Sequence, residues 1–123
     1  MSDEVGRELK LVEAKYGELE VDASFQWFIV KRWPLAGWGK PATSVLVLLT
    51  GYRAVPPDNF YTDADLRLAS GAMPGNASNV VALAGGNWLQ FSYHIEREDW
   101  QPQKGDNLLT FLLGVEKRLS EAS

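Results

Sequence analysis

Few residues of this chain are able to do covalent or acid–base chemistry. Its 123 residues include no cysteine and one histidine, His94. Because disulfides, thiolate zinc sites and cysteine nucleophiles all need a thiol sulfur, the sequence excludes all three. A cluster of histidines around a metal is excluded as well. We expect no metal site and no cofactor.

A serine stands two positions before this histidine. In an extended strand, Ser92 and His94 would project from the same face. A serine hydroxyl becomes a nucleophile when a base lies within hydrogen-bonding distance, so the pair is a catalytic candidate. Neighbouring polar residues on a strand are usually only neighbours, and we favour a structural role in which His94 holds the segment around Trp100.

The acidic residues and the net charge indicate a solvated surface rather than a charged binding face. We interpret the paired carboxylates as exposed surface; they are Asp3-Glu4, Asp63/Asp65 and Glu96/Glu98-Asp99. The net charge is −4 and no Lys/Arg cluster alternates with aromatic residues, so a nucleic-acid partner is not expected.

The longest apolar run, residues 45–49, is too short to cross a bilayer. We expect a cytoplasmic protein with no membrane partner.

A helix is predicted near each end of the chain. Ser2 can cap a helix that ends at Gly17, with Val5, Leu9, Val12 and Tyr16 recurring at helical spacing. The opposite face of this helix is expected to be exposed to solvent; it carries Glu4, Arg7, Glu8, Lys10 and Lys15. Asp106 is predicted to cap a second helix, whose core face comprises Leu108, Leu109, Phe111, Leu112, Val115 and Leu119.

Two strands are predicted in the first half of the chain. Alternating apolar positions between Val21 and Ile29 predict one strand, which ends before Trp33-Pro34. Proline and glycine make residues 34–42 a connection. Residues 43–50, which include the apolar run 45–49, predict a central strand that is covered on both faces.

The second half of the chain carries weaker signals. A strand is expected within residues 59–68, after the Pro56-Pro57 turn, and a short one at 88–95. Residues 69–87 are rich in Gly, Ala, Ser and Asn and are expected to be largely irregular, with Gly85-Gly86 in a turn between short strands. Together these elements predict one α+β domain over residues 1–123.

Two motifs in this order resemble those of ubiquitin-conjugating enzymes. The segment 51–61, which contains Pro56-Pro57, resembles the tandem-proline turn that joins two strands in that family. Trp100-Gln101-Pro102 and the apolar helix after it look like the family's Trp-x-Pro and following helix. The resemblance implies the family's fold: an N-terminal helix, an antiparallel meander of about four strands, a long irregular segment like the family's active-site segment, and a C-terminal helix.

A third segment resembles the neighbourhood of the family's catalytic cysteine. Gly85 to Leu89 is similar to the family's Gly-x-x-Cys-Leu, with Trp88 at the position of the nucleophile. The fuller pattern from Trp88 to His94, followed by Trp100, looks like the bacterial branch called prokaryotic family E. The asparagine of the family's His-Pro-Asn motif has no clean counterpart; Asn76 and Asn79 are candidates by distance from Trp88.

The resemblance implies a role in a bacterial ubiquitin-like modification system, in the context of antiphage defence. The expected partners are a ubiquitin-like protein, its adenylating activating enzyme and a metal-dependent deubiquitinase-like peptidase. We expect a non-catalytic protein that binds or presents these partners, since it has no thiol. The expected binding residues are Pro56, Pro57, Trp88, Phe91, His94 and Trp100.

Two alternatives stay open. The chain could be an active conjugating enzyme that uses another nucleophile, such as Ser92, or a cysteine supplied by a partner. It could also be a stand-alone ligand-binding domain, because a fold does not dictate a function.

Overall fold

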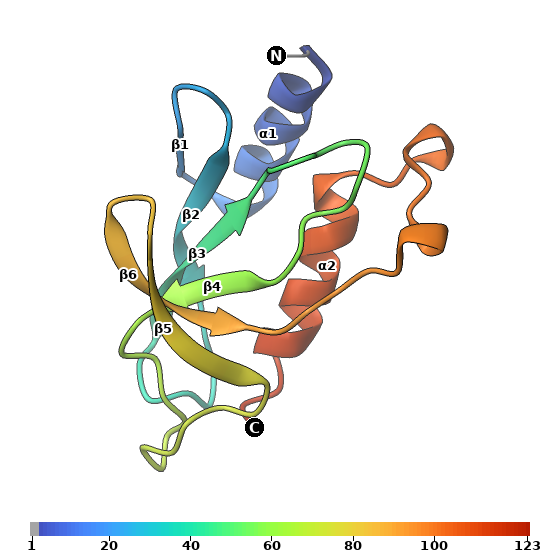
Figure 1. Ribbon diagram of the computed structural model, residues 1–123. Coiled ribbons are helices and arrows are strands. Elements are labelled where there is room, and N and C mark those ends of the chain that lie inside the picture. The colour runs from blue at the N-terminus through green and yellow to red at the C-terminus, as the bar shows by residue number, and fades with distance from the viewer. Residues whose placement is uncertain (1–2) are drawn as a thin grey trace.

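The computed structural model describes residues 3–123, apart from the side chains of Asp3 and Ser78, and a helix lies near each end of the chain (Figure 1). Helix α1 spans Asp3–Tyr16 and α2 spans Leu108–Leu119. The predicted cap Ser2 lies outside the described residues. Helix α1 ends as predicted at Gly17, whose φ of 92° is in the left-handed region that favours glycine.

The cap of α2 corrects the prediction by one residue. The side chain of Asn107 accepts hydrogen bonds from the backbone N–H groups of Leu109 and Thr110, and the Thr110 hydroxyl accepts one from the Asn107 N–H. This reciprocal pair forms a capping box. Asp106 is unavailable as the cap because its carboxylate accepts the backbone N–H of Gln101 at 2.8 Å.

The sheet is antiparallel and has six strands, where about four were predicted. Its order is β1-β2-β3-β4-β6-β5, so β1 and β5 are the edges. The strands are β1 Leu19–Val21, β2 Trp27–Pro34, β3 Ala42–Leu48, β4 Phe60–Asp63, β5 Ala77–Leu83 and β6 Gly86–Phe91. The connection predicted at 34–42 is confirmed for residues 35–41, since Pro34 belongs to β2 and Ala42 to β3, and the strand predicted within 59–68 is confirmed as β4.

The single strand predicted between Val21 and Ile29 is wrong, because the chain turns there. The hairpin between β1 and β2 is closed by the carboxylate of Asp22, which accepts the Gln26 N–H, and Phe25 adopts a φ of 57°. Strand β2 then runs through Trp33-Pro34, with a register shift between Val30 and Trp33. The turn lacks glycine and proline, so the apolar alternation passes through it without a visible break.

The irregular segment predicted at 69–87 is also corrected, because it contains β5. Residues Ala84 and Gly85, with φ values of 47° and 75°, form the two-residue turn to β6. The predicted turn between short strands is therefore confirmed, one position earlier than Gly85-Gly86. Strand β6 ends at Phe91 rather than Ile95.

The sheet is apolar on both faces, and the two helices cover one of them (Figure 1). On the helix face, strand side chains pack with α1 and α2; they are Phe28, Val30, Val45, Val47, Phe60, Leu89 and Phe91. The other face, called here the open face, carries a second cluster of Ile29, Leu46, Tyr61 and Trp88. Strand β3 contributes to both clusters, and its successive residues Val45, Leu46 and Val47 are each 0% exposed, so the prediction of a strand buried on both faces is confirmed.

Candidate functional site

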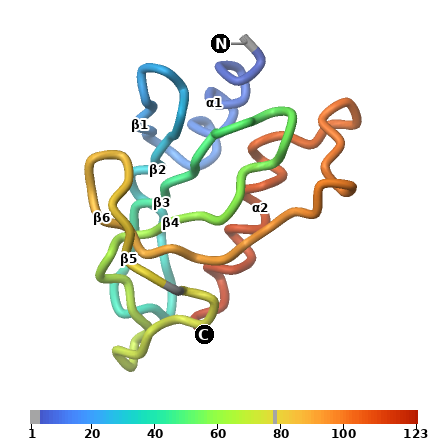
Figure 2. The backbone as a smooth tube through the Cα atoms, in the orientation of Figure 1, coloured from blue at the N-terminus to red at the C-terminus, as the bar shows by residue number. Residues whose placement is uncertain are grey.

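Two segments that are distant in the sequence lie against each other beside the start of α2 (Figure 2). One is the turn 51–59 and the other is the segment 92–101; together they are called the proline-turn site. The indole N–H of Trp100 donates to the Arg53 carbonyl at 3.1 Å, and the Asn59 N–H donates to the Tyr93 carbonyl at 2.8 Å. These bonds join the two motifs on which the resemblance to conjugating enzymes was based.

The tandem prolines lead the chain out of this turn and into β4. Pro57 is buried and Pro56 is half-buried. Prolines fix the backbone φ and lack an N–H, so they end ladder pairing at this point. Asn59 follows with a φ of 60°, and its side chain accepts the Tyr93 N–H at 3.4 Å. The turn is therefore held on both sides of its prolines.

His94 is bonded to Asp58 of the same site. Its Nδ1 contacts a carboxylate oxygen of Asp58, and both side chains are largely exposed, at 57% and 71%. This contact ties the segment 92–101 to the proline turn. Its partner is Asp58, whereas His94 was expected to hold the segment around Trp100. With Nδ1 engaged, Nε2 is the ring nitrogen left to face a partner.

The Ser92/His94 pair lacks the geometry of a nucleophile and its base. Strand β6 ends at Phe91, so the two residues do not share a strand. Across residues 3–123, no hydrogen bond joins them; the imidazole contacts Asp58 instead, and the Ser92 N–H donates to the Asn76 carbonyl at 2.9 Å. A serine without a base in reach is a poor nucleophile.

Trp88 and Phe91 lie away from the proline-turn site, on opposite faces of β6. Trp88 is 8% exposed on the open face, and its indole N–H donates to the Leu83 carbonyl at 3.0 Å. Phe91 is buried on the helix face, where its ring stacks on Phe60 at 4.9 Å. Of the six expected binding residues, the structure brings together Pro56, Pro57, His94 and Trp100.

Glu8 is the residue of this region that sequence reasoning missed. It was expected on the solvent-exposed face of α1, but it is only 6% exposed. Its carboxylate accepts the Arg53 Nε–H at 2.6 Å, the Leu108 N–H at 2.8 Å and the Tyr52 hydroxyl. Glu8 thus joins α1, the proline turn and the first turn of α2. Its spacing from the core residues Val5 and Val12 could have indicated its burial, because positions 5, 8 and 12 lie on one face of a helix.

Burial and the hydrogen bond to Glu8 raise the pKa of Tyr52 well above its ordinary value near 10. A phenol with a raised pKa in the folded state stabilises the fold fully below pH about 10, and this contribution is lost as the pH rises further. We expect the free energy of unfolding to fall between about pH 9 and about pH 11, and to fall less steeply in Tyr52→Phe. Urea denaturation across this range measures both slopes; equal slopes would contradict the role given to Tyr52.

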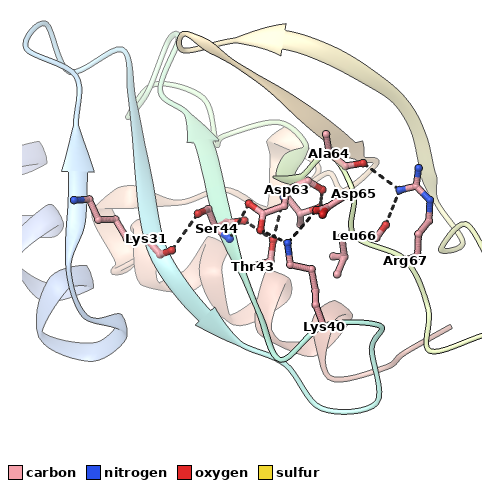
Figure 3. A network of polar contacts seen from close by, with 10 residues as sticks. Lys31, Lys40, Thr43, Ser44, Asp63, Ala64, Asp65, Leu66 and Arg67 are labelled. Atoms are coloured by element: carbon pink, nitrogen blue, oxygen red, sulfur yellow. Dashed lines mark hydrogen bonds and ion pairs between the residues drawn. The ribbon is translucent and has the colours of Figure 1, made fainter. Parts of the chain in front are cut away.

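A separate polar network fixes the connection between β2 and β3 (Figure 3). Lys40 Nζ lies 2.8 Å from Asp63 and 3.0 Å from Asp65, and Asp63 also accepts the Ser44 N–H at 3.2 Å. Hydrogen bonding to Lys40 lowers the pKa of Asp65. Both carboxylates bind Lys40, but only the Asp65 side chain is largely exposed, as predicted; that of Asp63 is 30% exposed. This arrangement ties Lys40 to β4 and serves the fold.

The side chains that the structure describes, those of residues 4–77 and 79–123, offer no group of three or more His, Cys, Asp or Glu placed to hold a metal ion. None of the helices in that part is both long and apolar enough to span a membrane.

Comparison with known proteins agrees with the joined motifs of the proline-turn site. The family model described as prokaryotic E2 family E matches residues 3–122. No curated protein and no solved structure matches the chain. The match covers almost the full sequence and includes both segments of the site. The chain therefore belongs to prokaryotic E2 family E, and it is a member without cysteine.

Proposed function

We propose that this chain is a non-catalytic member of its family, which binds or presents a ubiquitin-like protein or its activating enzyme. The single observation that carries the proposal is the absence of cysteine from a sequence that the family model matches over residues 3–122. Membership of an E2-like prokaryotic family points to a bacterial ubiquitin-like system, and antiphage defence is the setting we propose for it.

The chemistry of transfer supports a binding role. A carrier of ubiquitin-like cargo must attack a thioester and then release the acyl group readily, and a thiolate does both. Trp88, at the position expected for the nucleophile, is buried, and its indole N–H is bonded to Leu83. Within the part of the chain that the structure describes, no hydrogen bond links Ser92 to His94, whose Nδ1 contacts Asp58 instead. The chain can still hold a partner through contacts that form and break without a covalent step.

The proline-turn site supplies the surface we propose for this contact. Asp58 and His94 are exposed beside the half-buried Pro56. Trp100 and Glu8 hold the turn in place through their hydrogen bonds to Arg53. A surface that is fixed by part-buried hydrogen bonds of its own loses little conformational freedom on binding, which favours affinity. Its polar pair provides both a hydrogen-bond acceptor and a ring nitrogen for a partner.

Titration tests the proposal. The labelled chain is mixed with the cognate ubiquitin-like protein, and separately with the activating enzyme. We expect binding by one of them below about 100 μM, weakened at least about tenfold by Asp58→Ala and by His94→Ala. The matched control is the exposed pair Glu18–Lys31, bonded at 2.9 Å, whose Glu18→Ala variant should bind as the parent does.

Three outcomes would count against the proposal. Absence of binding to both proteins at about 100 μM would leave it without support, since weaker contacts are hard to distinguish from non-specific ones. Equal affinity of the Asp58→Ala, His94→Ala and Glu18→Ala variants would move the binding surface away from the proline-turn site. Absence of genes for an adenylating enzyme and a ubiquitin-like protein beside the gene for this chain would favour a stand-alone ligand-binding domain instead.

A further inference from the structure

The stretch from Leu68 to Ile95 contains no Asp, Glu, Lys or Arg, although the whole chain contains 16 acidic and 12 basic residues. This stretch includes all of β5 and β6 and therefore one complete side of the sheet. Charged residues resume at Arg67 and Glu96, outside the hairpin. One edge of a molecule with a net charge of −4 is thus electrically neutral.

Strand β5 has one free side. It is the last strand in the order of the sheet and pairs with β6 only. A two-residue hairpin turn closes on a hydrogen-bonded pair, here Leu83 and Gly86, and such pairs alternate along an antiparallel ladder. Val81 and Leu83 therefore direct their backbone groups to β6, and Val80 and Ala82 direct theirs outward. Among the residues whose side chains the structure describes, 4–77 and 79–123, no hydrogen bond to these outward groups is found.

The two edges of the sheet differ in how they are protected. Edge strands usually avoid pairing with other chains by being short, or by carrying charges or proline. At one edge, β1 has three residues, includes Glu20 and begins directly after Glu18. At the other, β5 has seven residues with neither a charge nor a proline, and Val80 is 50% exposed. A bulge between Ala77 and Val80 limits the regular edge to the second half of β5.

From this edge we propose that β5 pairs antiparallel with β5 of a second copy of the chain, making one sheet continuous through both. With Val81 of each copy opposite its counterpart, each Val80 faces Ala82 of the other copy, and the outward groups form four hydrogen bonds. A two-fold symmetric contact of this kind uses the same surface on both copies. The side chains of Val81 and Leu83 would extend the open-face cluster across the junction.

Charge selects a second copy as the occupant. Two chains of net charge −4 repel each other, and the neutral stretch 68–95 is where that repulsion is weakest. A charged peptide would find no opposite charge along β5 to fix its register. The β5 strand of another copy is itself uncharged and extended, so it satisfies the edge without introducing an unpaired charge.

Sedimentation equilibrium of the purified chain over a range of concentrations tests this inference, and it needs no ubiquitin-like partner, so its outcome is independent of the proposed function. We expect the mass of two chains at high concentration. Ala82→Pro removes one outward N–H from each copy, and proline is tolerated at edges, so the dissociation constant should rise at least about tenfold. The control Ala82→Thr keeps the N–H and should associate as the parent does.

A parent chain that remains monomeric at about 100 μM would overturn the inference. So would a dimer with the same affinity in Ala82→Pro as in the parent. Circular dichroism checks that Ala82→Pro is folded. If it is not, Val80→Lys replaces it: two like charges brought to the junction should weaken association at least about tenfold, and unchanged association would reject the edge contact.

Discussion

Replacing Glu8 by alanine is expected to lower the free energy of unfolding by about 3 kcal/mol. The change leaves the Tyr52 hydroxyl, the Arg53 Nε–H and the Leu108 N–H without the acceptor that they share. Breaking a buried ion pair from one side typically costs about 3–5 kcal/mol. The lower end applies because the Arg53 side chain is 31% exposed and can regain contact with water. Urea denaturation measures the loss.

Glu4 provides the matched control for Glu8. It binds the same Arg53 guanidinium at 2.7 Å, but its side chain is 53% exposed. Exposed pairs contribute little, so Glu4→Ala should change the free energy of unfolding by at most about 1 kcal/mol. Similar losses in Glu4→Ala and Glu8→Ala would contradict the view that the buried carboxylate joins α1, the proline turn and α2.

Replacing Gly114 by alanine is expected to destabilise the protein by about 2 kcal/mol. In an exposed helix the same change would stabilise by about 1 kcal/mol, because alanine favours helices. Here a Cβ atom on Gly114 would overlap the hydroxyl oxygen and Cζ of Tyr93 and lie 2.9 Å from its Cε2. The Tyr93 ring also packs against Phe111 at 5.1 Å, so it cannot move aside freely. Thermal or urea denaturation gives the change.

The control for Gly114 is the glycine of the other helix. A Cβ atom on Gly6, in α1, would meet nothing within 4 Å. Gly6→Ala should therefore stabilise the protein by about 0.4–1 kcal/mol. Opposite signs for the two variants are expected, and a stabilising Gly114→Ala would show that Tyr93 does not fill the space over α2. Truncation of Tyr93 to alanine should remove most of the cost of Gly114→Ala.

The ends of the fold could be predicted from the sequence, and its middle only in part. Both helices and the buried β3 have strong apolar periodicity, which local sequence reveals. The turn between β1 and β2 depends on the Asp22 carboxylate and on the φ of Phe25, neither of which interrupts the apolar pattern. Strand β5 consists largely of small or polar residues, and it becomes a strand by pairing with β6.

The candidate site was also predictable in part. Proline and Trp-x-Pro motifs identified Pro56, Pro57 and Trp100, and the structure brings them together with His94. Trp88 and Phe91 are three positions apart, and an odd separation along a strand places side chains on opposite faces. Their separation follows once residues 86–91 are known to be extended. The burial of Glu8 depends on Arg53 and Leu108, which are far from it in sequence.

The proposed absence of covalent transfer can be measured directly. The chain is incubated with its activating enzyme, ATP and the ubiquitin-like protein, and the intact mass of each polypeptide is then recorded by mass spectrometry. We predict that the chain keeps its unmodified mass throughout, including at times when the activating enzyme carries the ubiquitin-like protein as a thioester. A species whose mass is that of the chain plus one ubiquitin-like protein, and which disappears in Ser92→Ala or on treatment with hydroxylamine, would contradict the account.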